Sequence, residues 1–263
     1  MNESAAVIKQ CCATTYASPW ISLVLGESWH PGGLELTEHL GHQLALTAQD
    51  LVTDVAAGEG ASACHLARRF GCRVQALDIG ADQVQRARQH GAAQGLETRV
   101  TFQEGDAESL PWADRSVDAV VCECALCTFP SPEQAVREWA RVLKPGGRVG
   151  ITDVTRRGPL PPAFDNLAGW VGCLAGARPL DAYAELLRSE GFTVRRVEDR
   201  SSDLTALVTR IGHALVAWLR FQGSDATLGG WSRTDVERTL RGVLTSIDQG
   251  ELGYGLVTAW HPA

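Results

Sequence analysis

Residues 51–60 read Leu-Val-Thr-Asp-Val-Ala-Ala-Gly-Glu-Gly and predict a buried strand that turns sharply, through Gly58 and Gly60, into a helix over residues 61–70. Glycine at such a turn lets the backbone approach a ligand, and the N-terminus of the following helix presents free N–H groups. Asp78 closes the next predicted strand, where a carboxylate can accept hydrogen bonds from ribose hydroxyls. The stretch therefore predicts a binding site for a nucleotide-like cofactor.

The same loop argues against two common cofactor classes. It lacks the third glycine of a dinucleotide fingerprint and the Gly-Lys-Ser/Thr sequence of a phosphate-binding loop. These absences disfavour NAD and ATP, and favour a cofactor without phosphate groups. S-adenosylmethionine (SAM) fits that description.

Regular alternation of strand and helix patterns predicts the fold class. Such alternation is typical of a parallel sheet covered by helices on both faces. Strands are expected at residues 51–55, 73–77, 100–103, 117–121 and 148–153, and helices at residues 61–70, 81–94 and 132–143. Residues 144–147, Lys-Pro-Gly-Gly, are expected to form a turn between the last of these helices and the fifth strand.

The C-terminal part of the chain follows a different pattern. It predicts helices over residues 163–177 and 181–189, then strands over residues 192–198 and 253–260. If these two strands pair antiparallel, the helical segment over residues 203–249 is an insertion at the edge of the sheet. It could serve as a lid or an oligomer surface, but its apolar residues at helical spacing favour packing against the domain.

Composition narrows the classes of function. The 263 residues are 44% hydrophobic, which is enough for one elaborated domain over residues 1–263, and the net charge is −7. Neither a dense basic run nor a membrane-length apolar segment occurs, so we expect no nucleic-acid partner, no membrane partner and a cytoplasmic location. A small molecule or metalloid is the expected substrate, and the oligomeric state stays open.

Several motifs together make the chain resemble the class I SAM-dependent methyltransferases over about residues 34–192. They are Asp54-x-Ala-x-Gly58-x-Gly60, Asp78, residues 104–108 (Glu-Gly-Asp-Ala-Glu) and residues 141–147 (Arg-Val-Leu-Lys-Pro-Gly-Gly). The resemblance implies a Rossmann-like, seven-stranded, mostly parallel sheet whose last two strands form an antiparallel edge.

The resemblance also implies roles for individual residues. Gly58 and Gly60 would let the backbone approach the methionine part of SAM, Asp78 would bind ribose, and Asp54 would orient the loop. Asp106 and the Ala107 amide would recognise adenine. The predicted cofactor-binding set is completed by Tyr16, Ala56, Ile79, Cys122 and Glu123.

Within that class, the cysteines resemble those of the arsenite methyltransferases. That family has an Asn-Cys pair after the fourth strand, where this chain has Glu123-Cys124, and a Gly- and Cys-containing segment that corresponds to residues 172–177. The resemblance implies that Cys124 and Cys173 hold trivalent arsenic. The family's N-terminal extension with its own redox cysteines is missing, so Cys12 or its neighbour Cys11 is proposed as the third ligand or the resolving thiol. Residues 1–33 are expected to cap the active site.

The chemistry of such a substrate agrees with a thiol-rich site. Trivalent arsenic binds soft thiolate sulfur and keeps a lone pair that can attack a methyl sulfonium, so no general base is required. Oxidation of the metalloid on methylation requires two electrons from a thiol reductant, and Cys11, Cys12 or Cys127 could relay them through a disulfide. Cys12, Cys124, Cys127 and Cys173 are therefore the candidate catalytic residues. Cys12, Cys124 and Cys173 are the candidate metalloid ligands.

Other interpretations of these residues stay open. Cys124-x-x-Cys127 has the spacing of zinc ligands, and Cys122 could add a third sulfur. If the fourth strand continues far enough, Cys122 and Cys124 share the face that is turned toward the methyl donor. The chain could instead be a small-molecule O- or N-methyltransferase whose cysteines only line an apolar pocket. Glu123 either orients the substrate or raises the pKa of the neighbouring thiols.

Overall fold

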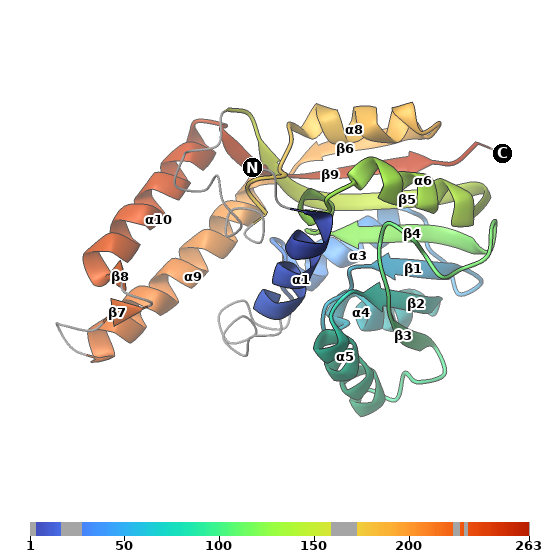
Figure 1. Ribbon diagram of the computed structural model, residues 1–263, viewed down its shortest axis with the longest axis horizontal. Helices are drawn as coiled ribbons and strands as arrows, with labels where there is room; N and C mark the ends of the chain where they lie inside the picture. Colours follow the sequence, from blue (N-terminus) through green and yellow to red (C-terminus); the bar gives the residue numbers. More distant parts are fainter. Residues whose placement is uncertain (1–3, 17–27, 159–172, 223–226, 229–230, 263) are drawn as a thin grey trace.

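The computed structural model describes residues 4–16, 28–158, 173–222, 227–228 and 231–262. Its main feature is a seven-stranded sheet with the order β3-β2-β1-β4-β5-β9-β6. The first five of these strands run parallel, and β9 pairs antiparallel with both β5 and β6. The prediction of a Rossmann-like, mostly parallel sheet is therefore confirmed (Figure 1).

The element bounds follow the expected alternation closely. The strands of the sheet are β1 (Leu51–Val55), β2 (Arg73–Asp78), β3 (Val100–Glu104), β4 (Val117–Glu123), β5 (Leu143–Arg156), β6 (Thr193–Asp199) and β9 (Leu252–Trp260). The helices are α1 (Ala5–Tyr16), α3 (Gly33–Gln43), α4 (Ala61–Phe70), α5 (Ala81–Ala93), η1 (Leu126–Thr128), α6 (Pro132–Val142), α8 (Leu180–Ser189), α9 (Ser201–Gln222) and α10 (Arg233–Asp248).

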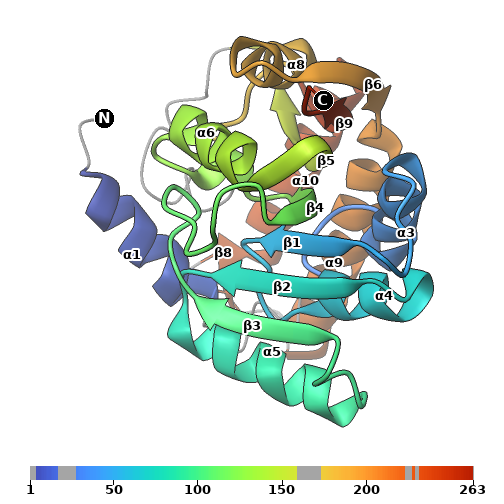
Figure 2. The same cartoon turned by 90° about the vertical axis from the view of Figure 1, so that its right-hand side faces the viewer.

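Helices cover both faces of the sheet (Figure 2), and a hydrophobic cluster fills the space on each face. On one face, α3, α4 and α5 pack against side chains such as Val52 and Val74. On the other face, α6 and α8 surround the fully buried Trp139 and Tyr183. Because both faces are covered, the central strands are apolar on both sides, as expected for a parallel sheet.

Two local predictions need correction. The Lys-Pro-Gly-Gly segment lies within β5 instead of preceding it, and Gly146, at φ +74°, falls where the pairing of β4 with β5 shifts register between Val117 and Ala119. The predicted helix over residues 163–177 lies outside the described residues up to residue 172. Residues 173–179 form no helix, and Cys173 at their start adopts a left-handed conformation with φ +62°.

The segment before the last strand forms a helical pair beside the sheet. A short hairpin of β7 (Thr227–Leu228) and β8 (Trp231–Ser232) joins α9 to α10, and the two helices extend away from the sheet in Figure 1. A Cβ at Gly212 of α9 would lie 2.6 Å from Leu240 Cδ1, so glycine permits the close packing of this pair. Leu204 of α9 packs against the main core, whereas Trp218 is 38% exposed. None of the described helices is long and apolar enough to cross a membrane.

Replacing Gly60 with alanine is expected to destabilise the fold by about 2 kcal/mol, because left-handed backbone and steric overlap both oppose a side chain there. Gly60 precedes α4 at φ +80°, and its Cβ would lie 2.5 Å from Phe102 Cε1. Urea unfolding measures the change. Gly95→Ala is the matched control, because Gly95 has φ +67° but no atom within 4 Å of its Cβ position. If both variants lose the same free energy of unfolding, the Phe102 ring moves aside without destabilising the fold.

Candidate functional site

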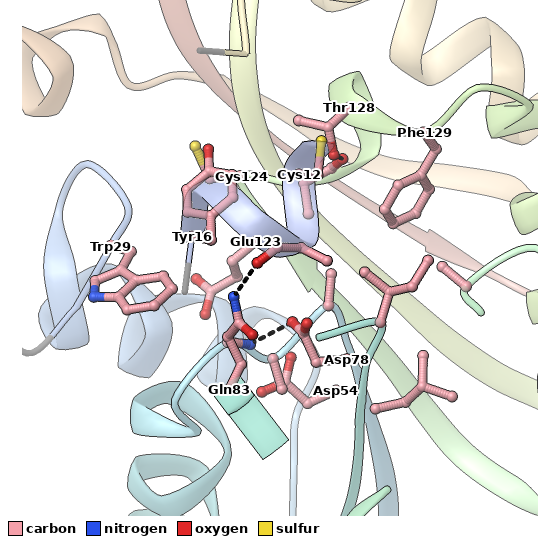
Figure 3. A pocket seen from close by; sticks show the side chains of 18 of the residues that line it. Cys12, Tyr16, Trp29, Asp54, Asp78, Gln83, Glu123, Cys124, Thr128 and Phe129 are labelled. Atoms are coloured by element: carbon pink, nitrogen blue, oxygen red, sulfur yellow. Dashed lines mark hydrogen bonds between the residues drawn. The ribbon is translucent and has the colours of Figure 1, made fainter. Parts of the chain in front are cut away.

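A cavity lies where β1, β2 and β4 end, as expected for an open parallel sheet (Figure 3). Most of the residues predicted from the sequence line it: Cys12, Tyr16, Asp54, Ala56, Gly58, Asp78, Ile79, Asp106, Ala107, Glu123 and Cys124. Gly60, Cys122, Cys127 and Cys173 do not belong to this lining. The sequence therefore predicted the place of the cavity correctly, but some of the residues that it assigned to the site do not line this cavity.

The glycine loop is fixed by Asp78. Its Oδ2 accepts a hydrogen bond from Gly58 N at 2.8 Å, and its Oδ1 accepts one from Gly80 N at 2.9 Å. Ala56 and Gly58 have φ values of +61° and +55°, so the loop backbone bends tightly at the cavity wall. Burial raises the pKa of the Asp78 carboxyl, although the backbone donors oppose this shift.

Gly60 has a different role from the one expected. It stands behind the loop, and the space that its side chain would need is filled by Phe102. Gly60 is thus required for packing between the loop and β3, whereas Gly58 faces the cavity with Trp29 Cε3 3.3 Å from its Cβ position. The sequence pattern could not separate these two reasons for glycine, because both require a residue without a side chain.

The second acidic position, Asp106, is paired with the N-terminal helix. Lys9 Nζ of α1 lies 2.7 Å from Asp106 Oδ2 and 2.5 Å from Glu108 Oε2. The same helix is joined to α5, because Gln83 Nε2 donates to Ala13 O at 3.1 Å. These contacts place α1 across the cavity, as the side chains in Figure 3 indicate.

Two carboxylates at the floor of the cavity leave one oxygen each without a partner among the described residues. Asp54 is 2% exposed, accepts the Ala63 N–H and leaves Oδ2 unpaired. Glu123, with a side chain 4% exposed, leaves Oε1 unpaired. Burial and the charges of Glu123 and Asp78 raise the pKa of Asp54 well above its usual range. Such a floor fits a cationic ligand, and SAM carries both an ammonium and a sulfonium.

Three thiols meet beside this cavity. The Cys173 thiol donates to the backbone oxygen of Cys124 at 3.6 Å, and the hydroxyl oxygen of Tyr16 lies 3.8 Å from the Cys173 sulfur. The side chains of Cys124 and Cys127 lie close enough to Cys173 to shift its pKa. Cys124 borders the cavity, whereas Cys127 and Cys173 are 2% and 5% exposed and lie behind it. Both Cys124 and Cys173 have positive φ, at +55° and +62°, which is uncommon for residues other than glycine.

The hydrogen bonds within the cluster separate the three thiol pKa values. Hydrogen bonds from Cys124 and Cys127, together with the one from Tyr16, hold the pKa of Cys173 well below its usual range. The bond to Cys173 raises the pKa of Cys124, and burial raises that of Cys127. Of the three cysteines, Cys173 is therefore the one whose thiolate form its neighbours favour most.

The structure places Cys122 and Cys12 differently from the sequence prediction. Cys122 does not share a face with Cys124, because β4 ends at Glu123 and the left-handed Cys124 redirects the chain. Cys122 is fully buried in the cluster under α6. Cys12 lines the cavity, but Cys127 is the residue that contacts Cys173 together with Cys124.

Alkylation of Cys12 by iodoacetamide at pH 8 is expected to be on the order of 50-fold slower in the folded chain than in the urea-unfolded chain, since only the thiolate reacts. Burial, with the negative charges of Cys173, Cys11 and Asp78, raises its pKa to about 12. Peptide mass spectrometry over time measures the rate. Between pH 8 and pH 10 the rate should rise about tenfold per pH unit only in the folded chain. A rate independent of pH would show steric shielding instead.

No group of three or more His, Cys, Asp or Glu side chains that could hold a metal ion occurs within the described part of the chain. The zinc alternative therefore has no preassembled site there. Cys124, Cys127 and Cys173 are near neighbours, but they are not placed as a ready-made set of metal ligands.

Some residues of the site were not recognisable from the sequence. Trp29 stacks on Tyr16 with ring centroids 5.9 Å apart, and Thr128 and Phe129 line the opposite wall. Lys9, Gln83 and Trp29 belong to no motif, so their roles arise only from folding. Thr128 and Phe129 follow β4 directly, and their position after a strand of the parallel sheet was a usable signal.

Comparison with known proteins identifies the family. Residues 53–151 match the model of the methyltransferase domain. The chain is 36% identical over 172 residues to methyltransferase GfsG of Streptomyces halstedii, which covers 64% of this chain and 62% of that protein. It is 30% identical over 233 residues to 27-O-demethylrifamycin SV methyltransferase of Amycolatopsis mediterranei, which covers 86% of this chain and 83% of that one. An arsenite methyltransferase of Halobacterium salinarum is 32% identical over 154 residues, 56% of this chain but only 38% of that protein.

A solved structure agrees on the fold. Phosphoethanolamine N-methyltransferase 2 of Haemonchus contortus, in complex with SAM, superposes with a TM-score of 0.76 at 18% identity, and covers 95% of this chain and 57% of that one. The sheet order, the glycine loop fixed by Asp78 and the Amycolatopsis relative, which matches over 83% of its own length, all agree. The chain belongs to the methyltransferase domain family and is a class I SAM-dependent methyltransferase.

Proposed function

We propose that this chain transfers the methyl group of SAM to a trivalent, thiophilic metalloid, with arsenite or methylarsenite as the first candidate. The observation that carries the proposal is the contact of Cys173 with both Cys124 and Cys127 beside the cofactor cavity. Soft thiolate sulfur is the ligand that trivalent arsenic prefers. The Halobacterium relative supports the same acceptor class, although it matches over a minor part of its own length.

The three thiols suit the binding step chemically. Cys173 would bind as the thiolate, because its neighbours lower the pKa of its thiol. The protons of Cys124 and Cys127 would leave with two arsenic hydroxyls as water, and the third hydroxyl would leave as hydroxide. An acceptor that enters from the cavity first meets Cys124, which is the member of the cluster that lines it.

The remaining residues would position the methyl donor. We propose that Asp78 binds ribose, that Asp106 and Ala107 recognise adenine, and that the Gly58 loop contacts the methionine part. SAM supplies an electrophilic methyl group at this place. α1 would act as a cap that keeps water away, supported by the pairing of Lys9 with Asp106 and Glu108. The metalloid rises by two in formal oxidation state, so a thiol reductant must return two electrons.

The test is direct. Purified protein is incubated with SAM, arsenite and excess thiol, and the arsenic species are separated and quantified against a reaction without enzyme. Methylated arsenic in a stoichiometric ratio to S-adenosylhomocysteine is the expected result. Formation of no methylated arsenic in the presence of demonstrated SAM binding would contradict the metalloid proposal.

A second candidate is O-methylation of a small organic molecule. It is favoured by the 27-O-demethylrifamycin SV methyltransferase, which matches over most of its length, and by the aromatic side chains of Tyr16, Trp29 and Phe129 around the cavity. If this candidate is correct, an organic hydroxyl acceptor will support S-adenosylhomocysteine formation, and Cys127→Ser will leave that rate nearly unchanged.

A further inference from the structure

Asp153 is a buried carboxylate that has no part in the methyl transfer proposed above. It lies near the C-terminal end of β5, is 2% exposed and does not belong to the lining of the cavity. A carboxyl group in such a place destabilises the fold unless hydrogen bonds compensate for the lost water. Its hydrogen-bond partners therefore indicate what it contributes.

Both oxygens of Asp153 accept hydrogen bonds from backbone N–H groups. Cys127 N donates to Oδ2 at 2.8 Å, and Val154 N donates to Oδ1 at 2.8 Å. Cys127 lies in η1, a short 3-10 helix whose N-cap residue, Ala125, forms no side-chain hydrogen bond to it. The first N–H groups of a helix have no partner within the helix. Asp153 supplies the missing acceptor from β5, and so fixes the place of Cys127.

The segments of the other two cysteines of the cluster are held to β5 by main-chain hydrogen bonds. Cys124 N donates to Thr152 O at 2.6 Å. The segment that begins at Cys173 is held through Arg156, whose backbone N–H donates to Arg178 O at 3.0 Å. β5 thus supports all three cysteines, and it holds Cys127 through the side chain of Asp153.

The three cysteines form one buried group beside the cavity. Cys127 and Cys173 belong to the same hydrophobic cluster, and Cys124 packs against it. Cys124 lines the cavity (Figure 3), and Cys173 is the cysteine whose thiolate form its neighbours favour most. These two sulfurs would bind a trivalent arsenical first. Cys127 is then the third sulfur, and its distance from the other two decides whether a third As–S bond can form.

We propose that Asp153 positions Cys127 as the third sulfur ligand of the metalloid acceptor. The proposal rests on the function proposed above, because it treats the thiol cluster as the acceptor site. Asp153 lies outside the cavity and acts through the Cys127 N–H. Removal of a residue that orients a ligand in this way typically lowers metal affinity by about 10- to 100-fold. Asp153 should therefore matter for an acceptor that needs three sulfurs, and not for one that needs two.

Arsenite and methylarsenite separate the third sulfur from the first two. Arsenite has three As–OH bonds and methylarsenite has two, and each As–S bond that forms replaces one As–OH bond, whose oxygen leaves as water or hydroxide. The arsenic stays trivalent, so binding requires neither a methyl donor nor electrons. Titration calorimetry in a phosphine reductant gives the dissociation constant of each arsenical, since added thiols would compete for arsenic. S-adenosylhomocysteine, titrated in parallel, shows whether the cofactor cavity is intact.

Asp153→Ala should weaken arsenite binding by about tenfold and change the affinities for methylarsenite and S-adenosylhomocysteine by less than about twofold. Asp153→Asn should weaken arsenite alone by about threefold, because a hydrogen bond to a neutral acceptor is about half as strong as one to a charged acceptor. This variant carries the test if the alanine variant does not fold. In a chain that already carries Cys127→Ala, neither substitution should lower the arsenite affinity further, because the effect of Asp153 passes through Cys127.

Asp118→Ala is the matched control for these variants. Asp118 also accepts a hydrogen bond from a backbone N–H group, that of Leu51 at 2.9 Å, but it lies at the opposite end of β4 from the cysteines. Its removal also breaks the ion pair with Lys144. It should lower the free energy of unfolding and leave all three affinities unchanged.

The outcomes separate this proposal from the proposed function. If the wild type binds arsenite and both Asp153 variants bind it equally well, Asp153 does not position Cys127, and the metalloid acceptor stands. Equal weakening of both arsenicals would show that Asp153 supports the whole site. A further loss of arsenite affinity in the Cys127→Ala chain would show that Asp153 acts through another residue. A wild-type protein that binds neither arsenical would overturn the proposed function and this proposal with it.

Discussion

Cys173→Ser is expected to lower the rate of arsenite methylation by at least about 100-fold and to leave the affinity for S-adenosylhomocysteine within about twofold. Cys173 lies between Cys124, Cys127 and Tyr16, and these neighbours hold the pKa of its thiol well below its usual range. A serine hydroxyl is a harder ligand and stays protonated at neutral pH, so it can replace neither the sulfur ligand nor the negative charge. Separation of arsenic species after a fixed incubation measures the rate.

Cys11→Ser is the matched control for this variant. Cys11 also lies partly buried near the cavity, but its sulfur makes only a 3.9 Å contact with Thr15 Oγ1 on the same helix. We expect its methylation rate to stay within about twofold of wild type, because no contact with the cluster is removed and the excess thiol in the assay replaces any relay of electrons through Cys11. If Cys173→Ser retains wild-type activity, the cluster does not hold the acceptor and the thiol mechanism is wrong.

Asp78→Ala is expected to weaken binding of S-adenosylhomocysteine by on the order of 100-fold, because hydrogen bonds to a charged group are worth about 1.5–3 kcal/mol each. The substitution leaves Gly58 N and Gly80 N without their acceptor, so the loop loses its shape. It also removes the carboxylate that we propose to bind the ribose. Titration calorimetry measures the loss.

Asp82→Ala separates this effect from a change in overall charge. Asp82 is exposed in the first turn of α5, four positions after Asp78, and its removal should leave affinity nearly unchanged. Asp78→Asn should fall between the two variants, since it keeps one acceptor oxygen for the backbone N–H groups. An affinity of Asp78→Ala equal to that of Asp82→Ala would remove Asp78 from the cofactor site.

Much of the fold could be predicted because local pattern and tertiary environment agree. The stretch over residues 51–70 has the same strand and helix bounds in the sequence prediction and in the structure, since its apolar run, two glycines and helical period all favour one conformation. The secondary structure of residues 143–147 was harder to predict from the sequence. Its Pro-Gly-Gly sequence favours a turn locally, and residues 144–147 fall in a register shift where they pair with neither β4 nor β9. They belong to β5 because Leu143 before them pairs with Val117 and Arg148 after them pairs with Ala119.

The complete membership of the thiol cluster could not be predicted from the sequence. The sequence nominated Cys124 and Cys173 by family resemblance, but it ranked Cys12 above Cys127 as third ligand. The structure brings Cys127 to Cys173 because η1 follows directly after the left-handed turn at Cys124. The backbone conformation of a single residue decides this, and no period or spacing in the chain encodes it.

The sequence by itself determined the parallel sheet, the glycine loop at its carboxyl edge and the acidic residues that end β1 and β2, because strand period and glycine placement are local properties. Only the tertiary structure decided that Lys9 pairs with Asp106, that Cys173 meets Cys124 and Cys127, and that Asp54 and Glu123 each keep a free oxygen. These contacts join residues far apart in the chain. They depend on how separate elements pack. The order of residues alone does not show which side chains become hydrogen-bond or ion-pair partners, or which stay without one.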